Sequence, residues 1–273
     1  MGLCGIGLSG VIGLSSLCSF TCRFTMTNLL ERIRAEKTEQ FVAFLDLLGF
    51  SEKVKANWDD AARTYAKIIG VAETVSDHYR ELLGNDWTTS VQIVSDSIII
   101  TGGDLHWVAA MAQGIQTGAI LTSGILLRGG IAFGPHSQVN DARNTYAVSS
   151  ALASAVAAER LAHFPRIILD RATGVEGQGR DALRTGSPLF MPCNDGLWMV
   201  VPLYTFDSRP DEEIYREYID LLEPLSSQYK DTVHSTKYDW MLDCVDTVRG
   251  HMESLREEGE ERAAEAQRED GDS

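Results

Sequence analysis

Two short apolar runs, Phe41–Phe50 and Val91–Thr101, are each interrupted by a single acid. Apolar runs of this kind are typical of buried β-strands. The two acids are Asp46 and Asp96. An ionised carboxylate in a buried strand costs free energy unless a cation or a hydrogen-bonding partner compensates it. The pattern therefore indicates that the two acids share a divalent metal.

The spacing of apolar residues along the rest of the chain predicts a mixture of helices and strands. Helices are expected over 28–37, 59–83, 104–121 and 150–163. Strands are expected over 41–47, 88–102 (two strands folded about residues 95–97), 125–133, 137–148 (a hairpin), 166–170 and 197–206. Gly134 and Pro135 are expected to close the strand over 125–133. This order predicts an α+β fold in which an antiparallel sheet is covered by helices.

The chain of 273 residues is long enough for one main domain, expected over 38–206, followed by a helical pair over 211–252. Residues 253–273 contain nine acids and three arginines without periodicity, which predicts a disordered tail or a frayed helix. The formal net charge of −15 argues against a nucleic-acid partner. Five cysteines without a paired CxxC spacing favour reduced thiols and a cytoplasmic protein.

Residues 1–25 form an apolar leader that fits no targeting class. Met1–Phe20 carries no charge and is rich in glycine, so it is a weak membrane span and lacks the basic region of a signal peptide. Ile6 stands where a myristoylation motif needs Ser or Thr. A mis-called start, with Met26 as the first residue, is the favoured interpretation; a disordered leader and a weak membrane anchor are the alternatives.

Strand alternation places Phe44 and Asp46 on one face of their strand, and Gln92 and Asp96 on one face of theirs. The four residues from Gln92 to Asp96 span roughly 13 Å along a strand. This is about the distance from a metal-bound triphosphate to the far edge of its base. One strand could thus hold phosphates near Asp96 and contact a base through Gln92.

Two further segments are suited to phosphates. Residues 47–51 form a turn that leads from the first strand toward the next helix, and backbone N–H groups at such a junction can bind phosphate oxygens. Arg128 lies in a predicted strand beside Gly129 and Gly130, which allow close backbone approach. The residues alone leave open that Asp46 and Asp96 are a buried acid and a turn residue, that Arg128 is a structural ion-pair partner, and that Gln92 and Tyr146 are structural.

Three motifs, FLDLLGFS, SDSIIIT and LRGGIAFG, occur in this order between Phe41 and Asp170. The ordered set resembles the class III nucleotidyl cyclases. Within that class the chain is similar to the bacterial Pycsar pyrimidine cyclases, which make cyclic UMP or cyclic CMP in antiphage defence. This closer similarity rests on Ser95 in place of the glycine of a G-D-S hairpin, on the form LRGGIAFG, and on AAERLAHFPRIILD.

The resemblance implies that Asp46 and Asp96 bind two divalent cations, Mn²⁺ or Mg²⁺, assisted by the Leu47 carbonyl. The residues that it assigns to the phosphates are Phe50 and Ser51, through their backbone, and Arg128. It also implies that the active species is a homodimer with sites at the subunit interface.

The same resemblance places Gln92 where purine cyclases carry a base-reading Lys or Glu, and Tyr146 where adenylate cyclases carry an adenine-reading Asp. Phe44 is expected to pack on the base. Since neither purine-reading residue is present, a pyrimidine is favoured. This chain differs from the family in one helix. The family carries there an Asn and an Arg that support the transition state, and this chain has Ala153 and Ala157 at those positions.

The function that the resemblance implies is conversion of UTP to 3′,5′-cyclic UMP and pyrophosphate, as a second messenger for a cyclic-nucleotide-responsive effector that needs no direct contact with this chain. Either Arg160, Arg143 or another group supplies the missing transition-state charge, or the chain is inactive. The alternatives are a cytidylate or adenylate cyclase, and an inactive cyclase-like module that binds nucleotide and regulates a partner.

Overall fold

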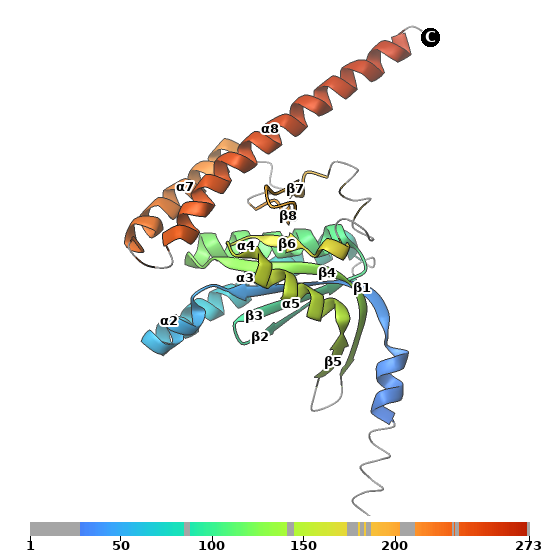
Figure 1. Ribbon diagram of the computed structural model, residues 1–273, viewed down its shortest axis with the longest axis vertical. Helices are drawn as coiled ribbons and strands as arrows, with labels where there is room; N and C mark the ends of the chain where they lie inside the picture. The colour runs from blue at the N-terminus through green and yellow to red at the C-terminus, as the bar shows by residue number, and fades with distance from the viewer. Residues whose placement is uncertain are drawn as a thin grey trace, which may run out of the picture.

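The structure is a computed structural model, and it describes residues 28–84, 88–140, 145–173, 180, 183, 187–202, 211–230, 232 and 235–271, without the side chains of 211 and 262–271. Its centre is an eight-stranded sheet in the order β2-β3-β1-β4-β6-β8-β7, with β5 paired to β4 (Figure 1). The strands are β1 (Thr38–Leu47), β2 (Ser90–Val94), β3 (Ser97–Gly102), β4 (Leu127–Asn140), β5 (Thr145–Ser149), β6 (Ile167–Leu169), β7 (Phe190–Pro192) and β8 (Trp198–Val200).

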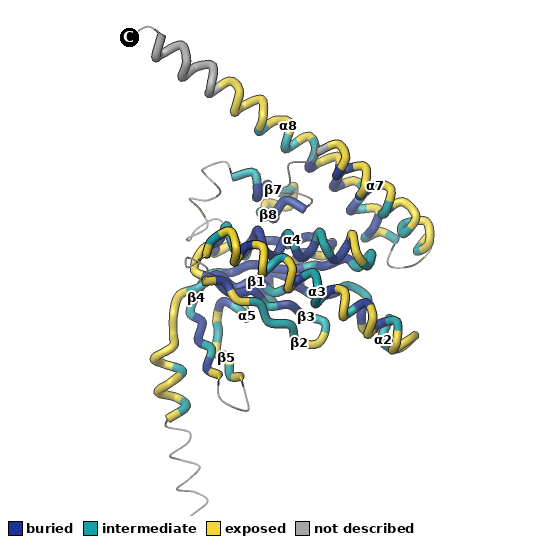
Figure 2. Tube along the Cα trace, turned by 180° about the vertical axis from the view of Figure 1, so that it is seen from behind, coloured by how far each residue is buried: buried dark blue, intermediate teal, exposed yellow. Residues whose placement is uncertain are grey.

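Strand β1 lies between β3 and β4 and pairs with both in antiparallel register. Its alternate residues Ala43 and Leu45 are fully buried in a core built with α3 (Trp58–Leu83) and α4 (Leu105–Ser123). The opposite face of β1 and β4 is covered by α5 (Ser150–Ala162), so helices lie on both sides of the sheet (Figures 1 and 2). We call the side of the sheet that carries Phe44 and Asp46 the site face.

The predicted α+β fold is confirmed, with one change in the sheet: β4 and β6 are parallel, so the sheet is mixed rather than wholly antiparallel. Helix α5 connects the β4–β5 hairpin to β6, and a helical crossover of this kind returns the chain in the same direction. Strand β4 also continues to Asn140, so Gly134 and Pro135 do not close it. Proline is tolerated there because Pro135 lies opposite Glu39 at the beginning of β1, and on its other side it falls between the residues that pair with β6 and with β5.

The turn after β1 leads into a short helix, α2 (Phe50–Ala56), that the sequence analysis did not predict. Asn57 ends α2 and begins α3, where its side chain accepts a hydrogen bond from the Asp60 N–H at 3.1 Å. Asp104 is the N-cap of α4, since its side chain accepts a hydrogen bond from the Trp107 N–H. The other predicted helices and strands are found near their expected positions, and Leu197–Phe206 is a strand over Trp198–Val200 within its described part.

The predicted C-terminal helical pair is formed by α7 (Asp211–Gln228) and α8 (Ser235–Gly271). These helices enclose a second core with β6–β8 and the ends of α4 and α5, whose fully buried members include Tyr218, Leu222 and Met241. Beyond this core α8 extends away from the body with mostly exposed residues (Figures 1 and 2). The helix runs on to Gly271, through most of the range for which the sequence suggested disorder or a frayed helix.

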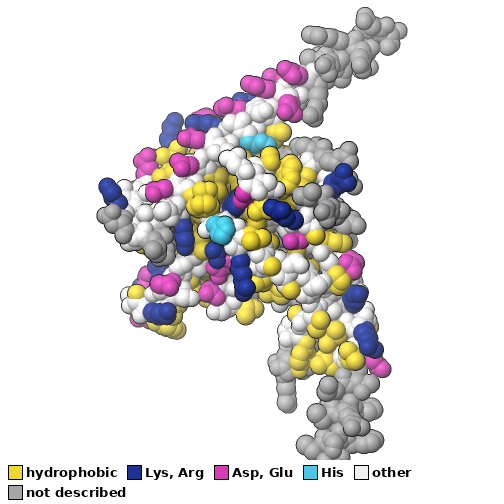
Figure 3. All heavy atoms as spheres, viewed as in Figure 1, with side chains coloured by type: hydrophobic (Ala, Val, Ile, Leu, Met, Phe, Trp, Pro, Cys, Tyr) yellow, Lys and Arg dark blue, Asp and Glu magenta, His cyan; other side chains and the backbone are white. Residues whose placement is uncertain are grey.

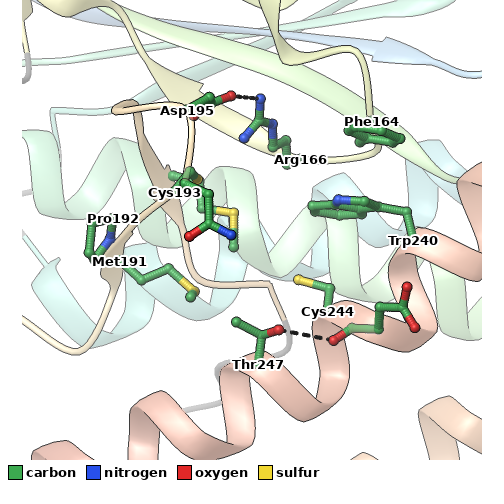
Figure 4. Close-up of a pocket in the computed structure, with 12 residues that line it drawn as sticks. Phe164, Arg166, Met191, Pro192, Cys193, Asp195, Trp240, Cys244 and Thr247 are labelled. Carbon is green, nitrogen blue, oxygen red and sulfur yellow. Dashed lines mark hydrogen bonds and ion pairs between the residues drawn. The ribbon is translucent and has the colours of Figure 1, made fainter.

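A cavity of about 280 Å³ lies where α8 meets the sheet edge. The Phe164 and Trp240 rings stack beside it with centroids 5.4 Å apart, and Arg166 forms an ion pair with Asp195 at 2.5 Å (Figure 4). Because Arg166 is buried, this ion pair compensates a charge inside the second core. The stack and the ion pair both lie where α8 rests on the sheet, and the stack joins α8 directly to the segment before β6.

Among the described helices, none combines the length with the apolar character that crossing a membrane requires. The leader over 1–25 and Asp141 lie outside the described residues. The predicted hairpin that has Asn140 and Asp141 at its tip is confirmed by the pairing of β4 with β5.

Candidate active site

Asp46 lies near the end of β1 on the site face, opposite Ser97 of β3 and Arg128 of β4. Opposite residues in antiparallel strands project to the same face, so Asp46 and Arg128 are neighbours by register. The Arg128 guanidinium is 3.8 Å from the Asp46 carboxylate. The two side chains are each about a quarter exposed, with 25% for Arg128 and 29% for Asp46. This edge of the site face is therefore accessible to a ligand.

Asp96 also lies at this edge of the site face, but it is positioned by a turn and not, as predicted, by the alternation of a strand. It lies in the turn between β2 and β3, so strand alternation with Gln92 does not set its direction. The Leu47 N–H donates a hydrogen bond to the Asp96 carbonyl at 3.0 Å, and the Ser51 hydroxyl donates to the Asp96 carboxylate at 3.3 Å. Ser95 has a left-handed φ of 57°, as the tight turn requires. The turn thus places Asp96 beside the end of β1.

Phe50 and Ser51 are the first two residues of α2, directly after the turn at Gly49. The Phe50 side chain is buried and packs on Tyr65, with ring centroids 5.7 Å apart, so it fixes α2 on α3. The Ser51 side chain is already engaged by Asp96. Any contact of these residues with phosphate would come from their backbone, and this contact stays a prediction.

Arg128 has a partner that the sequence analysis did not identify. It forms an ion pair with Glu159 of α5, whose side chain is only 6% exposed. Gly130 makes this contact possible, because a Cβ there would lie 2.3 Å from the Ala155 carbonyl oxygen and 2.7 Å from the Glu159 N. Glycine thus lets α5 pack directly on β4 and brings Glu159 to Arg128. Arg128 is a structural ion-pair partner whatever else it binds.

The electrostatics of the site show an excess of negative charge. Burial raises the pKa of Asp46 above its usual 3.8, and the nearby charges of Glu159 and Asp96 raise it further. The positive charges of Arg128 and Lys237 oppose this shift in the pKa of Asp46 without reversing it. Acidic and basic side chains lie next to each other on the side of the molecule seen in Figure 1, below the C-terminal helices (Figure 3).

These properties fit a divalent cation. Mg²⁺ and Mn²⁺ prefer carboxylate, carbonyl and water oxygens, and Asp46 and Asp96 supply two carboxylates beside the backbone of Leu47. Within the described residues no group of three or more His, Cys, Asp and Glu is arranged as a metal site. The residues therefore fit a cation that also takes oxygen ligands from water or substrate.

Further along the site face the register aligns Phe44 with Ile99 of β3, and Ile99 with Gln92 of β2. Phe44 and Gln92 therefore share the face that carries Asp46, as predicted. The Gln92 side-chain amide donates a hydrogen bond to the side-chain oxygen of Gln138, a residue that the sequence analysis did not single out. Gln92 lies two strands away from β1, and Gln138 lies in the part of β4 that extends beyond its pairing with β1.

Tyr146 is not brought to this group within one chain. Gln138 lies opposite Ala147 in the β4–β5 ribbon, whereas Tyr146 lies opposite the buried Val139. Since neighbouring strand residues alternate, Tyr146 projects from the other face of the ribbon than Gln138. A role for Tyr146 at the site would require the site of a second subunit.

Ala153 and Ala157, which stand where the resembling family carries an Asn and an Arg, are exposed on α5. Arg160 is also exposed there, and Arg143 lies outside the described residues. Glu159 could have been found from the sequence, because its spacing from the buried alanines at 155, 158 and 162 places it on the same side of the helix. Lys237 had no such signal, since only the packing of α8 brings it near Asp46.

Comparison with known proteins gives similarity at the level of solved structures. No protein-family model matches the chain, and neither does any curated protein. The guanylyl cyclase Cya2 matches with 10% identity and a TM-score of 0.43 over 63% of this chain and 96% of that one. The adenylyl cyclase CyaB from P. aeruginosa matches with 14% identity and a TM-score of 0.45 over 64% and 97%.

A dimeric guanylyl cyclase domain of the RhoGC fusion protein from the fungus Blastocladiella emersonii matches with 12% identity and a TM-score of 0.41, over 61% of this chain and 98% of that one. These three similar structures are thus adenylyl and guanylyl cyclases. At these low identities and TM-scores the matches do not by themselves assign a family or an activity to this chain.

Proposed function

We propose that this chain is a cytoplasmic nucleotidyl cyclase that converts UTP to 3′,5′-cyclic UMP and pyrophosphate. The observation that carries the proposal is the meeting of Asp46 and Asp96 at one edge of the site face, where carboxylate charge is in excess. A polar amide pair, Gln92 and Gln138, lies on the same face. Triphosphate and base would thus bind along a single surface.

Asp46 and Asp96 would hold Mn²⁺ or Mg²⁺, two per site, with the Leu47 carbonyl. Bound there, the cations supply positive charge to the triphosphate and lower the pKa of the ribose 3′-hydroxyl. The chain's own residues would hold the nucleotide so that O3′ attacks the α-phosphorus in line, forming the O3′–P bond as the bond to pyrophosphate breaks. The proton of O3′ leaves to solvent, and Arg128, oriented by Glu159, carries positive charge at the phosphates.

The amide chemistry of Gln92 is compatible with a pyrimidine base. Its side chain has one acceptor oxygen and two N–H donors, of which one is used by Gln138. The oxygen can accept from the N3–H of uracil while the remaining N–H donates to a carbonyl, and Phe44 offers an apolar surface nearby. Rotation of the amide would also suit cytosine, so the choice of uridine rests on the resemblance to uridylate cyclases. The proposed role in antiphage defence has the same basis.

The test is competition of UTP, CTP, ATP and GTP at equal concentration with Mn²⁺, with the products separated by mass spectrometry. Cyclic UMP is expected as the main product of the full chain, and Asp46→Ala and Asp96→Ala are expected to abolish it. Cyclic AMP or cyclic GMP as the main product would refute the pyrimidine assignment. Cyclic CMP would refute only the choice of uracil.

A second candidate is a cyclase-like module that binds nucleotide without turning it over. The observation that favours it is the pair of exposed alanines, Ala153 and Ala157, where the resembling family carries an Asn and an Arg. Calorimetry distinguishes the two functions. Binding of UTP to the full chain in Mn²⁺, together with the absence of any cyclic product, would favour the module.

A further inference from the structure

Four sulfur-containing side chains line the cavity between α8 and the edge of the sheet. They are Met191, Cys193, Met199 and Cys244 (Figure 4). The first three come from the β7–β8 hairpin, and Cys244 comes from α8. Met191, Met199 and Cys244 are buried, and Cys193 is half-buried. The cavity has a volume of about 280 Å³, so it brings sulfur atoms from two separate elements to one small space.

The pairing of β7 with β8 places the three hairpin sulfurs on one face. Met191 lies opposite Met199 in antiparallel register, and opposite residues project to the same side with Cβ atoms about 5 Å apart. Cys193 follows Met191 by two residues, and its N–H donates to the Leu197 carbonyl at 2.8 Å, so the hairpin pairing continues through it. The strand pleat therefore turns Cys193 to the same side as Met191. On this side the hairpin packs with the buried residues of α8 in the second core.

Sulfur ligands of this kind select a soft metal ion. Thiolates and thioethers bind Cu⁺, whereas the hard cations Mg²⁺ and Ca²⁺ take oxygen ligands. Zn²⁺ also binds thiolates, but its structural sites are closed by Cys and His ligands, and its other protein ligands are Asp and Glu. Within the part of the chain that the structure describes, no three residues of these types are grouped as a metal site. Thiols combined with thioethers therefore fit Cu⁺ better than Zn²⁺.

The charged residues at the cavity are compatible with a bound cation. Asp195 and Asp243 line the cavity, and the buried Arg166 is paired with Asp195 at 2.5 Å. A cysteine binds metal as its thiolate, so each bound thiol loses its proton. A single Cu⁺ bound by both thiolates leaves one negative charge, which the Arg166 guanidinium at the same cavity can partly compensate.

We propose that the cavity between α8 and the β7–β8 hairpin is a site for a soft monovalent metal ion, Cu⁺. Its ligands are the thiolates of Cys193 and Cys244 and the thioethers of Met191 and Met199. The ion keeps its oxidation state, and both thiol protons are released to solvent as the Cu–S bonds form. Methionine side chains are unbranched and flexible, so the thioethers can turn into the cavity without a change in the backbone.

The ion would connect two parts of the fold. Cys244 belongs to α8 and the other ligands belong to the β7–β8 hairpin, so a bound Cu⁺ ties the C-terminal helix to the edge of the sheet. A ligand that binds only the folded state stabilises it by mass action. The cavity shares no residue with the candidate active site, and the inference does not depend on the cyclase function.

The test is titration of the reduced full chain with Cu⁺, without oxygen, against the chromogenic chelator bathocuproine disulfonate. Cys4, Cys18 and Cys22 are replaced by Ser in every variant, so that the other thiols of the chain do not compete for the ion. Binding of a single Cu⁺ is expected. Cys193→Ala and Cys244→Ala should each weaken it about tenfold or more, because the thiolate is a charged soft ligand that Ala does not replace.

Methionine variants separate coordination from packing. Met191→Leu and Met199→Leu keep the apolar volume and remove the thioether, so each should weaken Cu⁺ binding, by less than the cysteine variants do. Met111→Leu is the matched control, because Met111 is fully buried in the core that α3 and α4 build and should leave Cu⁺ binding unchanged. X-ray absorption of the loaded chain should show sulfur neighbours around the ion. Cu⁺ should also raise the unfolding temperature of the chain that keeps both thiols, and not that of Cys244→Ala.

Equal Cu⁺ affinity in Cys193→Ala, Cys244→Ala and the chain that keeps both thiols would mean an adventitious ion only and would overturn the inference. An equal loss in Met111→Leu would overturn it too, because the loss would then follow from any change in a core. Zn²⁺ bound as tightly as Cu⁺ would overturn the choice of a soft ion. Circular dichroism shows that each variant is folded, and Cys193→Ala, at a half-buried position, keeps the test decisive if Cys244→Ala unfolds.

Discussion

The carboxylate of Glu159 on α5 forms an ion pair with the guanidinium of Arg128 on β4. The contact joins the LRGGIAFG strand to the alanine-rich helix that follows the β4–β5 hairpin. Glu159 is buried and Arg128 is partly exposed, so the carboxylate of the pair lies inside the protein and the guanidinium lies near its surface. It holds the guanidinium beside Asp46, and it is thus a structural contact that also shapes the candidate site.

The Arg128–Glu159 pair is expected to be strongly coupled in stability. Arg128→Ala leaves the Glu159 carboxylate buried without its partner, which should cost about 3 kcal/mol of the free energy of unfolding. Adding Glu159→Ala to that variant should restore part of the loss, because the uncompensated charge is removed. Urea unfolding of the two single variants and the double variant measures the coupling. Additive effects of the two substitutions would show that the pair contributes nothing to the fold.

Gly130 is expected to tolerate no side chain. In Gly130→Ala the new Cβ would lie 2.3 Å from a backbone oxygen of α5, so the helix must move away from β4. Overpacking typically costs about 1–3 kcal/mol, and backbone atoms yield less than side chains, so we expect a loss of about 3 kcal/mol. Gly103→Ala is the matched control, because its Cβ would have no atom closer than 4.0 Å. Similar unfolding midpoints for both variants would contradict the close packing of α5.

Asp46 is expected to destabilise the metal-free fold at neutral pH. Its folded-state pKa is raised above 3.8, chiefly by burial, so the unfolded chain loses the proton first as pH rises. The free energy of unfolding therefore falls between pH 3.8 and the raised pKa of Asp46, and this loss persists at higher pH. Asp46→Asn removes the effect, and this variant should be at least as stable as the unmodified chain at pH 7 without metal.

Urea unfolding near pH 3.5 and at pH 7, in EDTA, measures this difference. Asp220→Asn, which changes an exposed acid on α7, should show no such gain at pH 7. Added Mn²⁺ should stabilise the unmodified chain more than Asp46→Asn, because a ligand that binds only the folded state shifts unfolding by mass action. A loss of stability in metal-free Asp46→Asn at pH 7 would contradict the stated sign.

Activity is expected to require two subunits. Tyr146 projects from the other face of the β4–β5 ribbon than Gln138, so its proposed role depends on a partner's site. Asp46→Ala and Tyr146→Ala should each be inactive alone. A mixture of the two should recover part of the activity, since one site of each mixed dimer keeps an intact Asp46 and a partner's Tyr146. Full activity of a monomer in light scattering, or no recovery on mixing, would exclude shared sites.

The local pattern of hydrophobic and turn-forming residues was sufficient to predict most of the helices and strands. The apolar runs around Asp46 and Asp96 predicted strands, of which β1 and β3 have buried residues and β2 has none, and turn residues placed the β2–β3 and β4–β5 hairpins. Hydrophobic periodicity and backbone preferences act over a few residues, so they can be read along the chain. The predicted end of the strand at Gly134 was wrong because a proline is compatible with a strand where one side of the strand is unpaired, and Pro135 lies between the residues of β4 that pair with β6 and with β5.

The sequence by itself determined the strand positions of Asp46, Arg128 and Gln92, the turn that contains Asp96, and the helical character of the C-terminal segment. Only the tertiary structure decided which charges meet. Glu159 reaches Arg128 because Gly130 lets α5 touch the sheet, and the charge of Lys237 acts on the pKa of Asp46 only because the chain folds α8 back onto the body of the protein. Electrostatic interactions depend on separation in space and on burial, and neither quantity is encoded in local spacing.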